Sequence, residues 1–372
     1  MKDLVAAIGS WLRSSRDGYA LGLVRAIVGA LLFWHALGAA RDLAVFGYFG
    51  DAFHMPILPE ALVPSRTLYA VSLGARLLLA VLIVVGHRAR GALLASAALG
   101  LWVLLANRLE FHHNRYALFL YALLLAFTPC DRSLSLLEGA DEVTEERAGP
   151  FWAVLVAQVQ VALVYVASGG SKLLDADWRD GLVLADRIHR YGHVAVHHGV
   201  PARVVEALGR ADVSSALAKL AIMTELFVAV GLFARRARVY ALWGGVWFHL
   251  VIQLTSEVEV FTWLAIAVYG FFVTPDFRAR RFFFDPTRAK SRAWARAVRA
   301  LDWLARFEVK PWAPDDIKQG HSVVIVGRDG TRATGIRAVA MTARCLPVLF
   351  PIWAPLALAA SFTRGGEASS GS

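Results

Sequence analysis

Residues 66–86 read RTLYAVSLGARLLLAVLIVVG, and the basic group HRAR follows at once at residues 87–90. The first stretch is long and apolar enough for a membrane-spanning helix, because the hydrocarbon core is about 30 Å thick and a helix rises about 1.5 Å per residue. A basic group beside a span is typical of its cytoplasmic end. This stretch therefore predicts an integral membrane protein.

Similar apolar stretches recur along the 372 residues, of which 57% are hydrophobic and only 18% charged. These values are not typical of a soluble protein. The sequence predicts an all-α fold, a polytopic transmembrane helical bundle. We expect about eight spans, at about 19–40, 66–86, 91–107, 115–129, 151–170, 214–234, 239–255 and 260–275.

Basic clusters at residues 87–90, 235–238 and 278–281 give the orientation. All three fall on one side if the N-terminus is inside, so we expect both ends in the cytoplasm and a multi-pass protein of the cell membrane. These clusters also account for the net charge of +10 without a nucleic-acid partner. Cys130 and Cys345 both fall on the expected cytoplasmic side, which makes a disulfide framework improbable.

The predicted transmembrane domain spans residues 1–285. Within it, residues 174–213 are too polar to span, and they favour two helices at the extracytoplasmic interface that form a lid. Residues 286–372 form a small cytoplasmic tail. It begins with an amphipathic basic helix at 288–307, which we expect on the inner leaflet, and it includes a hairpin with an Asp-Gly turn at 322–335.

Three charged residues fall inside predicted spans, namely Arg25, Arg76 and Glu225. A charge within a bilayer costs several kcal/mol, so each is either paired or functional. Two interpretations stay open. The residues form internal salt bridges that hold helices in register, or they take part in catalysis.

The most informative stretch reads YVASGGSKLLDADWRDG at residues 165–181. It ends an apolar helix in small residues and places Lys172 at the membrane boundary, where a lysine can serve as a general base. The alternative is that Lys172 extends to the headgroups while Trp178 anchors the interface.

Two further groups of polar residues fall on the same expected side. EFHHNRY at residues 110–116 contains His113 and Asn114 in a turn between spans. His249 and Gln253 are four residues apart and therefore share one helix face. They line a polar cavity or serve only in packing, and both interpretations stay open.

Histidines also repeat at four-residue spacing, which is a weak metal-site pattern. They are His189, His193 and His197, with His198 beside them. Apart from Asp186, neither a carboxylate nor a cysteine supports them, so we predict no metal.

Five segments together carry a family pattern. They are HHNRYALFLYALLLAFTP at 112–129, SGGSKLLDADWRDG at 168–181, ELFVAVGLF at 225–233, WFHLVIQL at 247–254 and FTWLAIAVYGFFVTPD at 261–276. In order and spacing, over about residues 15–285, the chain resembles the vitamin K-dependent gamma-carboxylase family, and more broadly the HTTM (horizontally transferred transmembrane) domain.

That resemblance implies chemistry on the outer side of the membrane. In the family a lysine deprotonates reduced vitamin K, oxygen converts the quinol to an epoxide, and the strong base formed lets CO₂ add to peptide glutamates. By motif, Lys172 would be the base, and His249 with Asn114 or His113 would be partners near the quinone. The implied cofactor is a reduced quinone, either vitamin K or menaquinol.

The candidate site therefore has Lys172 and His249 as catalytic residues. Its candidate substrate- or cofactor-binding residues are His113, Asn114, Gln253, Asp175, Asp177, Trp178 and Glu225.

The chain also departs from the carboxylase pattern. It has one more residue between the lysine and Asp-Ala-Asp-Trp, so an ungapped alignment places Leu173 at the base position. It lacks the large extracytoplasmic domain that holds the peptide substrate in the animal enzyme. Residues 306–356 resemble the end of a DCC-type thiol-disulfide oxidoreductase-like domain, but Cys345 has no resolving partner for dithiol exchange.

Two functions follow as hypotheses. The first is a quinol-dependent oxygenase, or an enzyme like the vitamin K-dependent carboxylase and epoxidase, with an outer-facing site. The second is a non-catalytic membrane factor for the maturation, export or immunity of a secreted peptide. The expected partners are the lipid bilayer and a secreted peptide or protein substrate, and the substitution Lys172→Met discriminates between the two.

Overall fold

In the computed structural model, helix α3 occupies Arg66–Val85, the apolar stretch that predicts a span. The side chain of Ser65 accepts a hydrogen bond from the backbone N–H of Leu68 at 3.3 Å, which satisfies one of the free donors at the helix start. Gly86 then adopts a φ of +87°, a left-handed conformation that glycine takes without strain and that ends the helix. The chain reverses there, and α4 begins at Ala89.

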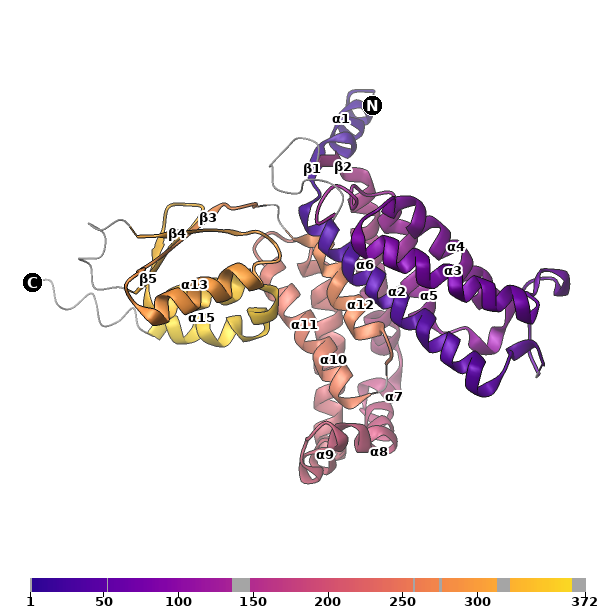
Figure 1. Ribbon diagram of the computed structural model, residues 1–372. Helices are drawn as coiled ribbons and strands as arrows, with labels where there is room; N and C mark the ends of the chain where they lie inside the picture. Colours follow the sequence, from indigo (N-terminus) through magenta and orange to yellow (C-terminus); the bar gives the residue numbers. More distant parts are fainter. Residues whose placement is uncertain are drawn as a thin grey trace, which may run out of the picture. The chain divides into compact units, whose positions relative to one another are not determined.

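The structure describes residues 2–51, 53–135, 148–256, 258–273, 276–312 and 322–362. They form two units, Met1–Val273 and Thr274–Ser372. The first unit is almost wholly helical, and the second combines helices with a four-stranded sheet (Figure 1).

The first unit contains both long and short helices. Its long helices are α2 Tyr19–Phe46, α3 Arg66–Val85, α4 Ala89–Ala106, α5 His113–Ala126, α6 Phe151–Leu174, α10 Ala211–Gly231 and α11 Arg238–Thr255. Its shorter helices are α1 Lys2–Arg13, α7 Ala176–Arg179, α8 Leu182–His197, α9 Ala202–Leu208 and α12 Phe261–Val268, the last followed by a 3-10 turn at Tyr269–Phe272. Two short strands, β1 Ser15–Asp17 and β2 Ala148–Pro150, pair antiparallel before α2 and α6.

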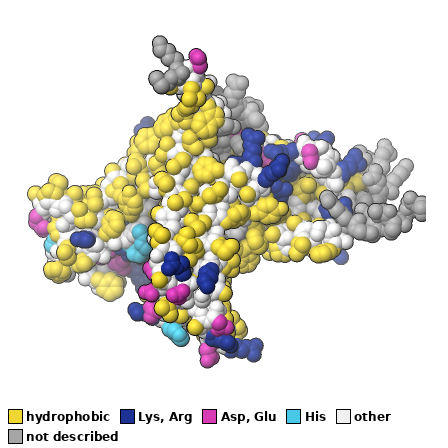
Figure 2. All heavy atoms as spheres, turned by 180° about the vertical axis from the view of Figure 1, so that it is seen from behind, with side chains coloured by type: hydrophobic (Ala, Val, Ile, Leu, Met, Phe, Trp, Pro, Cys, Tyr) yellow, Lys and Arg dark blue, Asp and Glu magenta, His cyan; other side chains and the backbone are white. Residues whose placement is uncertain are grey.

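Five helices of the described chain are long and apolar enough to cross a membrane. They are α2, which with the turn after it spans Tyr19–Asp51, and α3, α4, α6 and α10. Helix α5, helix α11 and the α12 region coincide with the other three predicted spans, and the total of about eight stays a prediction. Hydrophobic side chains cover most of the visible surface of these helices in Figure 2, whereas charged side chains gather near α8 and α9.

Close contacts between helices occur where a small residue faces a large one. A Cβ atom added to Gly100 of α4 would meet the ring of Phe119 of α5. Small residues let membrane helices approach in this way, and dispersion contacts then hold them together.

Arg25 of α2 is fully buried and donates hydrogen bonds to the backbone carbonyls of Cys130 and Leu134, at 3.3 and 2.7 Å. Arg25 thus joins α2 to the segment that follows α5 through carbonyl groups.

The segment at 174–213 is helical, as predicted, but it contains a short third helix besides the two expected. It contains α7, α8 and α9, and the role of a lid stays a prediction.

The second unit holds a mixed sheet in the order β4-β3-β5-β6. Strand β3 Arg280–Phe284 pairs parallel with β4 Phe307–Pro311 and antiparallel with β5 Val323–Val326. The remaining elements are β6 Arg332–Ala333, α13 Ala289–Leu301, α14 Gly335–Cys345, a 3-10 turn at Pro347–Ile352 and α15 Trp353–Phe362. The β5–β6 pair with its Asp-Gly turn confirms the predicted hairpin.

Two expectations for this part of the chain need correction. The fold is mostly helical, but the sheet means that it is not all-α. Helix α13 is amphipathic, as predicted, but Val298 and Ala295 are buried in the core beside the sheet, and Trp294 and Leu301 pack against the same core. Its apolar face is therefore covered by protein and is not a surface that meets the inner leaflet; contact of its basic face with that leaflet stays a prediction.

Candidate functional site

Lys172 and Glu225 form an ion pair between α6 and α10. The Nζ atom of Lys172 lies 2.6 and 2.7 Å from the two carboxylate oxygens of Glu225. Ser168 completes the group, because its Oγ donates to Glu225 at 2.9 Å and accepts from Lys172 at 2.9 Å. The side chain of Glu225 is 5% exposed and that of Lys172 17% exposed, so the pair is largely removed from solvent.

The local sequence of α6 explains this arrangement. Tyr165, Ser168 and Lys172 are separated by three and four residues and therefore share one helix face. A Cβ atom at Gly169 would lie 3.1 Å from the Cβ of Glu225, so glycine here lets α10 approach closely. The small residues before Lys172 thus bring it within reach of Glu225.

Trp178 borders the ion pair, but the two aspartates near it do not join it. The Nζ atom of Lys172 lies 5.1 Å from the centre of the Trp178 ring. The carboxylate of Asp175 accepts from the backbone N–H groups of Asp177 and Trp178 and so caps α7. Asp177 is exposed. Leu173, the alternative position for the base, has an apolar side chain that is 45% exposed.

A second buried group lies on the same face of α6. The hydroxyl of Tyr165 is 2.6 Å from Nε2 of His249 on α11 and 2.5 Å from the hydroxyl of Tyr269. Thr262 of α12 donates to the backbone carbonyl of His249 at 3.2 Å. Three segments of the chain therefore meet at one continuous line of hydrogen-bonding groups.

Several buried polar atoms have no hydrogen-bond partner among the described residues. They include Nδ1 of His249, Oε1 of Gln253 and Oδ1 of Asn114. Buried polar atoms are nearly always satisfied, so such atoms indicate places for water or a ligand. The ring of Phe261 connects two of the predicted groups, because it contacts the rings of His249 at 5.4 Å and His113 at 6.3 Å.

An exposed ion network lies at the beginning of α5. Arg115 pairs with Glu110 at 2.7 Å and with Glu259 at 3.0 Å. Glu259 adopts a positive φ of +45°, which is strained for a residue other than glycine. Arg115 thus ties the start of α5 to the turn between α11 and α12, next to Phe261.

The sequence profile of the HTTM domain matches residues 14–277. The chain belongs to the HTTM domain family. Neither a curated protein nor a solved structure matches it. Every residue of the candidate site lies within the HTTM domain.

Sequence reasoning named Lys172, Glu225 and His249 of the HTTM domain but missed two residues that contact the same groups. Tyr165 and Tyr269 form the hydroxyl pair beside His249. Tyr165 could have been found, because it lies two helical turns before Lys172 on the same face. The sequence offers no comparable signal for Tyr269.

The part of the HTTM domain that the structure describes contains no group of three His, Cys, Asp or Glu side chains able to hold a metal ion. The histidines of α8 at four-residue spacing are exposed. The prediction of no metal stays a prediction.

Proposed function

We propose that this HTTM protein is a membrane enzyme that removes a proton from a lipid-like quinol, with Lys172 as the base. One observation carries the proposal, namely the Lys172–Glu225–Ser168 group at the end of an apolar helix long enough to span a membrane. A charged pair in this setting is costly, and intramembrane ionisable residues are functional candidates for that reason.

For Lys172 to act as a base, its ammonium group must first lose a proton. Glu225 is the acceptor for that proton, because both of its oxygens lie within 2.7 Å of Nζ. Ser168 donates to the carboxylate and holds Nζ at the same time, so it keeps the pair aligned. The neutral amine of Lys172 then takes a proton from the substrate.

The donors and acceptors at His249 and Gln253, on α11, fit a quinol. When bound, a reduced quinone would supply an acidic hydroxyl and, with oxygen, the oxidising chemistry that the family resemblance implies. Nδ1 of His249 and Oε1 of Gln253 are buried and lack partners among the described residues, so Oε1 would accept from a ring hydroxyl and Nδ1 would bind the other ring hydroxyl. The His249–Tyr165–Tyr269 chain would keep the His249 ring in one orientation.

We propose further that the site faces the outside of the cell membrane. The basic groups at 87–90 and 235–238 support this orientation, because they lie at the α3–α4 and α10–α11 turns. In this orientation α6 begins at Phe151 on the cytoplasmic side, so Lys172, near its other end, lies on the outer side.

The second unit supports a separate proposal, that it is a DCC-type domain without redox activity. A parallel β3–α13–β4 crossover is followed by the β5–β6 hairpin and α14. Cys345 is a buried free thiol, and burial raises its pKa, which keeps it protonated and unreactive. We expect the protein not to reduce disulfides in insulin; reduction that is lost in Cys345→Ser would contradict this.

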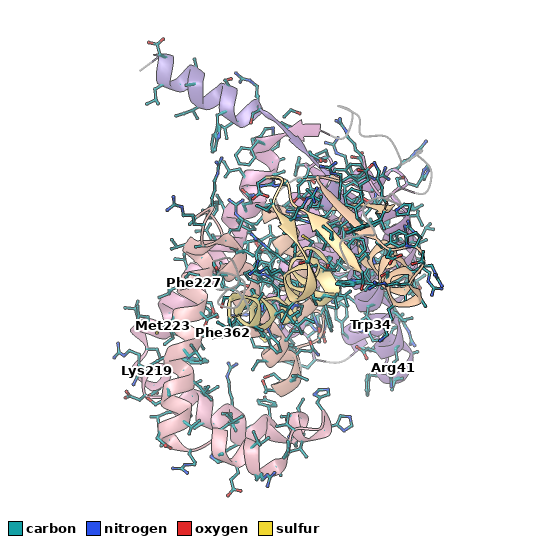
Figure 3. All side chains as sticks on the ribbon, turned by 90° about the vertical axis from the view of Figure 1, so that its left-hand side faces the viewer. Trp34, Arg41, Lys219, Met223, Phe227 and Phe362 are labelled. Carbon is teal, nitrogen blue, oxygen red and sulfur yellow. The ribbon has the colours of Figure 1, made fainter. Side chains whose placement is uncertain are left out.

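The main proposal is tested by adding reduced menaquinone or vitamin K to the purified protein without oxygen, then admitting oxygen and measuring the epoxide by mass spectrometry. We expect epoxide from the wild type and a loss of about 10²–10⁴-fold in Lys172→Met. Lys219→Met is the matched control. Lys219 is exposed on α10, where it lies on the same outward side as Met223 and Phe227 (Figure 3).

Equal epoxide formation by wild type and Lys172→Met would contradict the role of Lys172. Absence of epoxide from all three proteins would overturn the enzyme proposal. The Lys172–Glu225 pair would then serve to hold α6 and α10 together, and the peptide-handling membrane factor would become the better explanation.

A further inference from the structure

A second polar cluster lies within the helices of the first unit, on helices other than α6 and α10. Arg76 of α3 donates to Nδ1 of His35 of α2 at 2.8 Å. Its guanidinium carbon lies 5.3 Å from the centre of the Phe119 ring on α5. Arg76 is 2% exposed and Phe119 is fully buried, so three candidate or expected spans enclose one guanidinium group.

The charge of Arg76 is poorly compensated by its described neighbours. Arginine stays protonated in proteins, and a charge within a bilayer costs several kcal/mol. Lys172 meets that cost with a carboxylate, but no carboxylate of the described residues lies within 4.0 Å of Arg76. A histidine nitrogen and an aromatic face reduce the cost without cancelling the charge.

Most N–H donors of Arg76 are also available to a ligand. The guanidinium group has five N–H donors and no acceptor, and the described contacts use one of them. Because Nδ1 of His35 accepts from Arg76, the ring is neutral and its Nε2 carries the hydrogen. The cluster therefore offers several donors to a ligand that contributes only acceptors and a negative charge.

We propose that Arg76 and His35 form an intramembrane binding site for a carboxylate group. The planar fork of arginine matches two carboxylate oxygens, which gives a bidentate and charge-assisted pair. Arg76 lies midway along α3, about 15 Å from either end, so a lipid phosphate at the membrane surface does not reach it. The ligand is either an apolar carboxylate or bicarbonate, and the site does not depend on the proposed base.

The test measures thermal unfolding of the full-length protein in detergent with increasing hexanoate, with bicarbonate, and with hexanol as the neutral counterpart of hexanoate. A ligand that binds only the folded state raises the Tm as its concentration rises. We expect hexanoate or bicarbonate to raise the Tm of the wild type, and hexanol not to. Which of the two acts shows the source of the carboxylate.

Variants show whether the increase in Tm comes from binding at Arg76 or from a general effect of the anion on the protein. Arg76→Gln abolishes the increase in Tm, whereas Arg41→Gln retains it, because Arg41 is an exposed residue of α2, the helix that carries His35 (Figure 3). If Arg76→Gln does not fold, Arg76→Lys replaces it. Lysine keeps the charge but loses the fork, so the ligand Kd rises about tenfold.

No increase with either anion in the wild type, or an increase that Arg76→Gln or Arg76→Lys retains in full, would overturn the proposal. Neither result would affect epoxide formation at Lys172, so the two proposals fail separately.

Discussion

Lys172 and Glu225 bridge α6 and α10 through two contacts, with Nζ 2.6 and 2.7 Å from the carboxylate oxygens. The residues are far apart in the sequence, and each lies on a helix long and apolar enough to span a membrane. Their pairing therefore serves both stability and the proposed proton transfer. The two roles can be separated by substitution.

Glu225→Gln should destabilise the protein by about 3 kcal/mol, because it leaves the ammonium group of Lys172 without a counter-charge in a largely buried position. Thermal unfolding in detergent measures this loss. Pairing Glu225→Gln with Lys172→Met should recover part of the stability, since no lone charge remains. A double variant that loses as much as the two single variants added together would show that the residues do not interact.

Tyr165→Phe should lower the free energy of unfolding by about 2 kcal/mol or more. It removes the hydroxyl that contacts both His249 and Tyr269, and it leaves two buried polar groups unsatisfied. Tyr269→Phe should cost less, since Tyr165 keeps its bond to His249. Chemical or thermal unfolding tests the order. Tyr116→Phe is the control. Tyr116 is 42% exposed, so removal of its hydroxyl should leave the free energy of unfolding unchanged.

Membrane character and most helix positions could be predicted from the sequence, because apolar run length is a direct consequence of bilayer thickness. Residues 66–86 coincide with α3 almost from end to end. The fold of the second unit was harder to predict from the sequence. The pattern of α13 shows which residues are apolar, but only the fold shows that Val298 faces the sheet and not a lipid surface.

The sequence predicted which residues belong to the candidate site better than it predicted which of them contact one another. Glu225 stands out as a charge within an apolar stretch, and Lys172 as the end of one, but no spacing rule joins residues on separate helices. Tyr165 shares a helix face with Lys172, which is a usable signal. His35 lies in the apolar helix α2 and Tyr269 in the 3-10 turn after α12, and no spacing rule links either residue to its partner on another segment.

Gly245→Ala should disrupt the hydroxyl chain, because a Cβ atom there would overlap the hydroxyl of Tyr269. Overpacking of this kind costs about 1–3 kcal/mol, and the displaced Tyr269 would also lose its contact with Tyr165. Gly244→Ala is a close control, since its Cβ would have no neighbour within 4 Å. Equal stability of the two variants in thermal unfolding would contradict the packing of α11 against Tyr269.

Two Asp-X-Thr turns in the second unit allow a reciprocal test of pH dependence. Oδ1 of Asp285 accepts from the hydroxyl and the backbone N–H of Thr287, at 2.6 and 2.9 Å. Oδ1 of Asp329 accepts from the same two groups of Thr331, at 2.7 and 3.1 Å. In each turn the side-chain hydrogen bond, followed by the backbone one, holds the pKa of the aspartate below its ordinary value.

Thr287→Val should raise the pKa of Asp285 and leave that of Asp329 unchanged, and Thr331→Val should do the reverse, because each valine removes one hydroxyl donor and keeps the backbone N–H. Since the folded-state pKa is lowered, each turn stabilises the fold above the ordinary aspartate pKa, and that contribution is lost as the pH falls through the folded-state value. NMR titration of the ¹³C-labelled aspartate carboxyl carbons in the full-length protein measures both shifts. If both variants moved both aspartates equally, the cause would be a general loosening of the second unit and not the two local hydrogen bonds.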